Sequence, residues 1–471
     1  MKKIIKKIES AYGFVISVKF AVFTIVSLGI ISAVGTVYES LYDMEMAQEL
    51  VYHSPYMYVV LGFLCFTLVG VIIDRYPWKL HHLGFILAHV GIILLLLGSY
   101  VTRQIGVDGS MSFGIGEKQR RVLLSGKEVN IYASFGEGRL KRISRNKANF
   151  LQNPPSRQNP YVIESGNYKF EVLEYAHFAD RETQIKKSEL VKDGPALRFQ
   201  IEGSRAQFTQ WIRATQSKPF EQMQLGPAEI VLSPFQGVGQ GFEYKGGNVI
   251  VIRPDFKEKD RVLYEIYGKS KNGLIKKGHA QIGDVIPTGW MDFNFRILNF
   301  YPHSFFEVSY IPRKYPGKFS QPAILFRHQG QEYWLGLNAS RTFFEKDRGL
   351  ALAFEQSSIM LNFDILLKDF RIGRYQGTMR AASYESDVVV DGKVVNISMN
   401  EPMKHDGFTF YQASFQQDEM GKPTTSILSV NKDPGRWLKY LGSLLIVLGS
   451  TILFFFKKVF VKQRKSHEKS A

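Results

Sequence analysis

The chain has 471 residues, of which 45% are hydrophobic, 22% charged and 14% aromatic, and its formal net charge is +17. This composition excludes a disordered or collagen-like chain, and a mean hydropathy of -0.11 excludes a chain that lies mostly within a membrane. The single cysteine excludes an internal disulfide, a CxxC redox site, a cysteine-based zinc finger and a CxxCH haem-attachment site.

Four apolar stretches are each long enough to cross a bilayer as a helix, because about 20 residues at 1.5 Å rise span its hydrocarbon core. They are residues 20–38, 56–73, 81–100 and 438–456, and Lys439 is their only Lys, Arg, Asp or Glu. The sequence therefore predicts four membrane spans, with one large domain at 101–437 between the third and the fourth.

The charges of the connecting segments predict how these spans are oriented. The net charge is +4 over residues 1–19, +1 over 74–80 and +5 over the tail 457–471, whereas the 39–55 loop is -4 and holds no Lys or Arg. Cytoplasmic segments collect basic residues. We therefore expect both termini and the 74–80 loop in the cytoplasm, and the 39–55 loop and the large domain on the outer side, where nucleic acid is not an expected partner.

A cleaved signal peptide is the alternative interpretation of the first apolar stretch. Its apolar run is longer than the 7–15 residues usual in a signal peptide, and no A-x-A cleavage site follows it. We expect an uncleaved anchor.

The large domain has the pattern of β-strands. Runs such as 168–175, 248–252, 293–300 and 386–390 are rich in alternating, β-branched or aromatic residues and are bounded by Gly, Pro or Asn. We expect one or two antiparallel, sandwich-like units, with the polar stretch 143–160 as a linker or long loop. No phosphate loop, HExxH or GxSxG motif is present. Single histidines are expected to be surface or hydrogen-bonded side chains; they are His177, His279, His303, His328 and His405.

Three histidines lie in the third apolar stretch, where an ionisable side chain often marks a function. His81 and His82 lie at its cytoplasmic edge beside Trp78, where anchoring at the membrane interface explains them. His89 is eight residues further in, roughly 12 Å along a helix. It is either a neutral histidine hydrogen-bonded to a neighbour or a ligand or proton relay. A single helix cannot supply both axial ligands of one haem, since these approach from opposite faces of the macrocycle.

Two segments resemble the ResB family of system II cytochrome c biogenesis proteins. One is HHLGFILAHVGIILLLLGSYVTRQIGVDGSMSFGIGE at 81–117, and the other combines SDVVVDGKVVNISMNEPMKHDGFTFYQASF at 386–415 with SILSVNKDPGRWLKYLGSLLIVLGS at 426–450. The arrangement of three spans, a large outer domain and one final span agrees with that family. Between roughly 118 and 360 the resemblance rests only on β character and on GPALRF at 194–199.

The resemblance implies a subunit of a holocytochrome c synthase complex that moves haem b across the bacterial cytoplasmic membrane and takes part in its attachment to apocytochrome c. Whether this subunit makes any bond itself stays open. The implied partner is a CcsA-like (ResC-like) membrane protein with a tryptophan-rich haem-handling loop, because the five tryptophans here are dispersed and form no WWD-like cluster. A separate thioredoxin-like protein would reduce the substrate thiols. Some bacteria fuse the two subunits, and this chain resembles the unfused form.

The resemblance also assigns residues. The transmembrane haem-ligand histidine of the family corresponds to His89, while His82 and His53, just outside the second span, are weaker candidates for contact with haem. The motif residues have two interpretations, as turns and chain reversals or as a surface that docks the partner or apocytochrome c. They are Asn400, Pro402, Gly407, Tyr411 and Gln412, followed by Asp433, Pro434 and Gly435 before the last span.

Two other function classes compete with this interpretation. A non-catalytic β-rich envelope scaffold or receptor held by four spans needs no role for His89, and haem absorbance in the purified protein separates the two. A transporter acting alone is disfavoured, since four spans without inverted repeats or broken helices leave little room for a midplane site.

The charge distribution makes a direct prediction about topology. A reporter that is active only outside the cytoplasm should be active when it is fused after Ser110 or Gly246, and silent when it is fused after Phe456. Activity at Phe456 would overturn the four-span arrangement.

Overall fold

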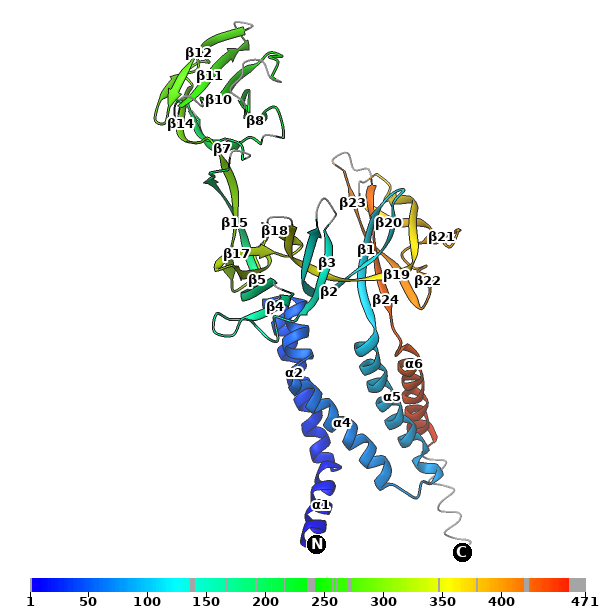
Figure 1. Cartoon of the computed structure of the whole chain (residues 1–471). Helices are drawn as coiled ribbons and strands as arrows, with labels where there is room; N and C mark the ends of the chain where they lie inside the picture. The colour runs from blue at the N-terminus through cyan, green and yellow to red at the C-terminus, as the bar shows by residue number, and fades with distance from the viewer. Residues whose placement is uncertain are drawn as a thin grey trace, which may run out of the picture. The chain divides into compact units, whose positions relative to one another are not determined.

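A computed structural model describes residues 2–135, 140–166, 168–190, 193–204, 206–215, 217–234, 242–255, 258, 261–269, 273–345, 348–377, 380–418 and 423–456. The predicted basic tail 457–471 lies outside these residues. The chain divides into two compact units (Figure 1). Unit 1 comprises residues 1–179 and 312–471, and unit 2 comprises residues 180–311.

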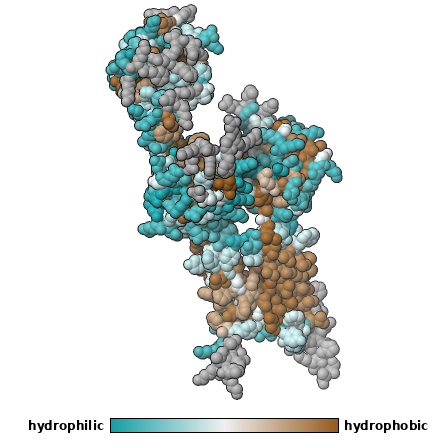
Figure 2. Space-filling model, in the orientation of Figure 1, coloured by the Kyte–Doolittle hydropathy of each residue, from teal (hydrophilic) through white to brown (hydrophobic). Residues whose placement is uncertain are grey.

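Within the described residues, unit 1 contains four helical segments that are long and apolar enough to cross a membrane. They are α2 (Val18–Leu41), α4 (Pro55–Asp74), α5 (Leu83–Ile105) with the turn before it, and α6 (Arg436–Thr451) with the turn that follows it to Phe455. The predicted fold class of four apolar helices with a large antiparallel β-rich part is therefore confirmed. Apolar surface covers these helices, and mixed, mostly polar surface covers the β structure of the same unit (Figure 2).

Shorter helical segments connect or extend the spans. The amphipathic helix α1 (Lys2–Val15) precedes α2. The loop between α2 and α4 folds into α3 (Met44–Ala47) and the π-helical turn η1 (Gln48–Tyr52), and η2 (Leu80–His82) leads into α5. The turn η4 (Ile452–Phe456) extends α6. Ser17 and Ser54 cap α2 and α4 through their hydroxyl oxygens, and Pro55 occupies the first turn of α4.

The largest sheet of unit 1 has, within the described residues, the order β21-β20-β19-β2-β1-β24-β23-β22, with β18 and β3 as side branches. Its strands are β1 (Val107–Gly114), β2 (Lys118–Phe135), β3 (Lys141–Ala148), β18 (Ala339–Glu345), β19 (Arg348–Arg374), β20 (Ala381–Val390), β21 (Lys393–Ile397), β22 (Met403–His405), β23 (Phe408–Gln417) and β24 (Pro423–Lys432). A second sheet joins β15 (Ser304–Arg313), β5 (Tyr168–Lys187), β16 (Gln321–His328) and β17 (Gln331–Gly336), and β4 (Tyr161–Ser165) pairs with β5. Strands β5 and β15 carry the chain between the two units.

The long antiparallel strands β2 and β19 pass through two separate hydrophobic cores of unit 1. One core includes Val122 and Ile365, and the other includes Val129 and Phe354. The register of the pair shifts between Gln356 and Ser358, where β2 passes from one core to the other. This irregularity interrupts the ladder next to Lys127, which bonds Glu45 in the helical part of the unit.

Unit 2 contains two further sheets around a core of its own. One sheet has the order β13-β14-β6-β7 and the other β12-β11-β10-β9-β8. The strands are β6 (Ala196–Glu202), β7 (Gln207–Arg213), β8 (Glu221–Leu225), β9 (Ala228–Leu232), β10 (Asn248–Pro254), β11 (Arg261–Gly268), β12 (Gly273–Gln281), β13 (Val285–Pro287) and β14 (Asn294–Tyr301). Strands β9 and β10 pair in parallel, which departs from the expected antiparallel pattern.

The predicted loop at 143–160 is partly wrong, because its first residues belong to strand β3, which pairs with β2. This strand has Lys141, Arg142, Arg145 and Lys147 on exposed positions, as edge strands commonly do. The polar composition of 143–148 led to the prediction of a loop where the chain forms a strand. Residues 149–160 are irregular, as predicted.

Helices α5 and α6 lie side by side and antiparallel, in contact through glycines spaced seven residues apart on each helix (Figure 1). A Cβ atom built on Gly91 would lie 2.6 Å from the carbonyl oxygen of Gly442, and one on Gly84 would lie 2.8 Å from that of Gly449. The third pair is closer still, because a Cβ on Gly435 would overlap the carbonyl oxygen of Gly98. Close backbone approach through small residues is a typical way in which membrane helices associate.

The glycine contacts predict that a larger side chain separates α5 from α6. Gly91→Leu should lower the stability of the full-length protein by about 1–3 kcal/mol, since the new side chain would overlap the α6 backbone. The thermal unfolding midpoint in detergent measures this change. Gly62→Leu in α4 is the matched control, because a Cβ on Gly62 meets no atom within 4 Å. Equal midpoints for the two variants would contradict the packing.

Candidate functional site

His89 lies in the middle part of α5 and its protonated nitrogen is identified by its hydrogen bond. The Nδ1 atom is 2.9 Å from the carbonyl oxygen of Phe85, one turn earlier. A carbonyl oxygen only accepts, so Nδ1 carries the hydrogen and Nε2 keeps its lone pair. Histidines that bind metals commonly donate their other ring N–H to such a partner, because it fixes the ring orientation. His89 therefore has the tautomer of a ligand that binds iron through Nε2.

The face of α5 that carries His89 is turned away from α6. His89 is two residues from Gly91, which places it about 200° around the helix from the glycine contact at 100° per residue. The His89 side chain is half-buried. The Phe85 ring packs against it with 3.8 Å between centroids, and the Arg75 guanidinium lies 3.5 Å from the Phe85 centroid. The imidazole is thus positioned by its own helix and the loop before it, and not by α6.

His82 lies seven residues before His89, and its Nδ1 atom has the opposite hydrogen-bonding role. Its Nδ1 accepts a long hydrogen bond of 3.4 Å from the backbone N–H of Lys79 at the start of η2. A backbone N–H only donates, so the hydrogen of neutral His82 is on Nε2. Its ring also packs against His81 at 4.1 Å between centroids. His82 therefore closes the turn that begins α5, and Nε2 offers no lone pair in this arrangement.

The acidic loop between α2 and α4 is bound to the β structure of unit 1. The Asp43 carboxylate bonds His177 Nε2 at 2.7 Å, and His177 Nδ1 bonds the Tyr175 hydroxyl at 2.8 Å. The Glu45 carboxylate accepts from Lys127, a lysine of β2 that is 7% exposed. Burial, and after it the charges of Glu45 and Asp43, raises the pKa of Tyr175. These contacts hold the loop and the β structure together on one side of the spans.

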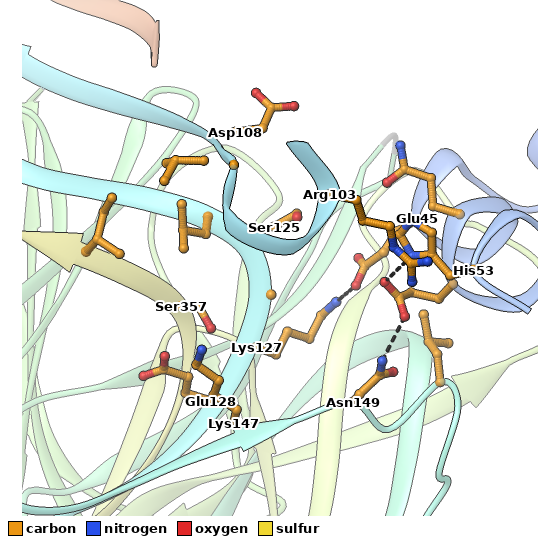
Figure 3. A pocket seen from close by; sticks show the side chains of 18 of the residues that line it. Glu45, His53, Arg103, Asp108, Ser125, Lys127, Glu128, Lys147, Asn149 and Ser357 are labelled. Atoms are coloured by element: carbon orange, nitrogen blue, oxygen red, sulfur yellow. Dashed lines mark hydrogen bonds and ion pairs between the residues drawn. The ribbon is translucent and has the colours of Figure 1, made fainter. Parts of the chain in front are cut away.

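A cavity of about 890 Å³ lies where α5 ends and β1 begins, bordered by η1, β2 and β3 (Figure 3). His53 lines it, with Nδ1 3.1 Å from a carboxylate oxygen of Glu49, which also accepts a hydrogen bond of 2.7 Å from the Asn149 amide. The hydrogen bond from His53 is the main reason why the pKa of Glu49 is lowered. A carboxylate accepts the Nδ1 hydrogen, so His53, like His89, keeps the lone pair of Nε2.

Asp433 bonds both α5 and α6 at the end of the helix pair that adjoins strands β1 and β24. Its carboxylate accepts a hydrogen bond of 2.5 Å from the Thr102 hydroxyl of α5 and one of 2.7 Å from the Lys439 ammonium of α6. Burial favours a higher pKa for Asp433, but the hydrogen bonds from Lys439 and Thr102 outweigh it and lower the pKa. Gly435 follows at the start of α6 and packs on Gly98, and Pro434 separates the two residues.

Comparison with known proteins adds a match over part of this unit. Residues 338–428 match the model of the ResB-like family. This segment of the chain is therefore similar to the ResB-like family. It is also similar to Protein NrfI of Wolinella succinogenes, with 35% identity over 114 residues. That alignment covers 23% of this chain and 12% of NrfI, so the matched part spans about an eighth of that relative.

The segment that matches the ResB-like model comprises strands β18 to β24 and includes most of the motif residues. Gln412 is buried and bonds the Ser386 hydroxyl at 2.6 Å, and its amide donates to Ser426, so that three strands meet at one polar contact. Gly407 has a positive φ of 76° in the hairpin turn between β22 and β23, where a glycine is favoured. In this ResB-like segment Gln412 and Gly407 thus hold the fold.

The other motif residues of the ResB-like segment lie at its surface. Asn400 is exposed and lies in the turn between β21 and β22, where the backbones of Ser398 and Glu401 bond each other. Pro402 follows that turn, and the Tyr411 side chain on β23 is 37% exposed. The structure thus separates Gln412, inside the sheet, from Asn400 and Tyr411, which remain candidates for a docking surface.

Several contacts around the candidate site were not predicted from the sequence. The glycine pairs of α5 and α6 were visible as seven-residue spacings within two apolar stretches, and this signal could have predicted their contact. The bonds of Asp43, Glu45 and Glu49 with β-structure residues that are distant in sequence left no local pattern. The structure does not bring His53, His82 and His89 together. His82 ends the turn η2 before α5, His89 lies within α5, and His53 lies beyond the other end of α5.

The Asp433 contacts predict a pH-dependent stability of the α5–α6 pair. Its pKa is lower in the folded protein than in the unfolded chain, so the stabilisation is present above the ordinary aspartate pKa and is lost as pH falls through the folded value. Asp433→Asn should reduce the free energy of unfolding at pH 7 by about 1.5–3 kcal/mol, the usual range for hydrogen bonds with charged groups. Chemical unfolding in detergent at several pH values measures this difference.

Asp391→Asn is the matched control for that experiment, because the Asp391 side chain is 64% exposed and pairs with His405 at the surface. It should change stability little. An Asp433→Asn protein as stable as this control at pH 7 would show that Asp433 does not hold the two helices together.

Proposed function

We propose that this ResB-like protein takes part in cytochrome c biogenesis as a membrane subunit that handles haem. The single observation that carries the proposal is the tautomer of His89. An imidazole deep in an apolar helix, with Nδ1 bonded to a carbonyl oxygen, offers Nε2 in a place where water is scarce. Haem iron gives that nitrogen a favourable partner, which offsets the free energy of placing a polar group there.

Haem is the cargo in this proposal, and the side chains around His89 fit it. The iron takes an axial imidazole on each face of its flat macrocycle. His89 supplies one of them from the α5 face opposite α6. Since His82 lies in the turn that leads into the same helix and has its Nε2 protonated, we assign the second ligand to another chain. A CcsA-like (ResC-like) partner is the proposed source, with apocytochrome c as the acceptor of the haem and a thioredoxin-like protein as reductant of its thiols.

The position of the β structure supports a role on the outer side of the bacterial cytoplasmic membrane. The acidic loop 39–55 and the β structure of unit 1 are hydrogen-bonded to each other, so they share a side of the membrane. The loop has a net charge of -4, and the segments at the other ends of the same helices are basic. We infer that both termini face the cytoplasm and that His53 lies on the outer side, where it is a second candidate for contact with haem.

The His89 assignment predicts a specific loss and a specific rescue. His89→Gly should insert normally, because removing a polar side chain keeps the span apolar, but it should lose most of the haem that copurifies with the protein and its partner. Added imidazole should restore haem absorbance by entering the space that the side chain leaves. The measurements are the Soret absorbance per protein and the yield of mature cytochrome c.

His82→Gly is the matched control, since it removes the same side chain from the turn that leads into α5, about 10 Å away. It should keep near-normal haem. If His89→Gly retains wild-type haem and matures cytochrome c normally, His89 is only a hydrogen-bonding residue, and the scaffold interpretation becomes the better one.

A further inference from the structure

The cavity at the end of α5 has the size of a small-molecule site. Its volume of about 890 Å³ falls within the range of about 300–1,000 Å³ that is typical of ligand pockets. Its walls come from the last turn of α5, the turn η1, the bulged part of β2 and the edge strand β3. It therefore lies where the helical part of unit 1 meets the β structure of the same unit, and Figure 3 shows side chains that line it.

The cavity is lined by more cationic than anionic side chains. Its carboxylates are Glu45, Glu49, Asp108 and Glu128, and its cations are Arg103, Lys127, Arg145, Lys147, Lys432 and Lys439. Three of the cations have carboxylate partners, in the pairs Lys127–Glu45, Arg145–Glu128 and Lys439–Asp433. Among the described residues, Arg103, Lys147 and Lys432 have no carboxylate within ion-pair distance. Of the described carboxylates, Asp108 has no such partner either, and Glu49 bonds the neutral His53 while its charge acts on Arg103 at longer range. The cavity thus has an excess of positive charge.

Arg103 is the cation of this cavity that lies at the end of a membrane-spanning helix. It lies on the last turn of an apolar helix, and its guanidinium is 4.5 Å from the ring centroid of Tyr58 on α4. It is about 40° around α5 from His89 and roughly 21 Å further along the axis. Lys147 faces the same cavity from β3 and is exposed. Cations in a concave site beside a low-dielectric region concentrate anions strongly.

We propose that this cavity binds the carboxylate or phosphate group of an amphiphile that lies at the adjacent membrane surface, with Arg103 and Lys147 as the recognising cations. The apolar part of the ligand remains beside the helices, and its anionic oxygens enter the cavity. A porphyrin with its propionates and an anionic phospholipid both have this chemistry. The proposal does not depend on haem ligation by His89.

The test uses two probes with the purified full-length chain in neutral detergent. Iron-free protoporphyrin IX carries the two carboxylates without a metal for His89, and its binding is measured by fluorescence anisotropy. Phosphatidylglycerol binding is measured by native mass spectrometry. At least one probe should bind the wild-type chain, and Arg103→Gln/Lys147→Gln should weaken that binding about tenfold, since each surface cation contributes noticeably to anion affinity. The probe that responds identifies the source of the anionic group.

Lys141→Gln/Arg142→Gln is the matched control. It removes one lysine and one arginine from exposed positions of β3, outside the cavity lining, and should bind the probes as the wild type does. Lys147→Gln alone provides a second variant should the double substitution impair folding, and His89→Gly should bind protoporphyrin normally. The proposal is overturned if neither probe binds the wild-type chain, or if the Arg103/Lys147 variant binds both as tightly as the control.

Discussion

The backbone contact between α5 and α6 is the constraint on which the rest of unit 1 depends. Three glycines from each side of the contact allow the two backbones to approach until carbonyl oxygens lie within 3 Å of the place where a Cβ would be. The same two chain segments continue as β1 and β24, which pair antiparallel from Val107–Lys432 to Gly114–Thr425. Asp433 bonds both helices at the point where helix pairing changes to strand pairing. One antiparallel ribbon therefore runs from the spans into the largest sheet.

This ribbon determines where the polar groups of α5 face. Because the glycine side of α5 is covered by α6, the residues half a turn away are left for another contact, and His89 is among them. The hydrogen-bonding role of the Nδ1 atom differs between the histidines in and beside the spans. His82 accepts from a backbone N–H, whereas His89 and His53 donate through Nδ1 to a carbonyl and a carboxylate oxygen. The direction of one hydrogen bond thus separates a histidine that closes a turn from two that keep the lone pair of Nε2.

The features that could be predicted from sequence are those that have a local cause. The length of an apolar run predicts a span, alternating β-branched residues predict strands, and an ionisable residue within a span is visible as His89. The remaining features depend on partners that are distant in sequence. Strand β3 is polar because it lies at an edge of the sheet, paired with β2. The parallel pairing of β9 with β10 has no local sequence pattern. The bond of Asp43 with His177 joins residues 134 positions apart, and the tautomer of each histidine follows from a backbone geometry that residue identity does not contain.

Haem ligation within the membrane is tested most directly by the reduced-minus-oxidised absorption spectrum of the full-length chain purified together with a coexpressed CcsA-like partner. If His89 supplies one axial ligand and the partner the other, the complex should show the sharp Soret and α bands of low-spin haem with two histidine ligands. An intact complex of both chains without these bands would contradict haem binding at α5.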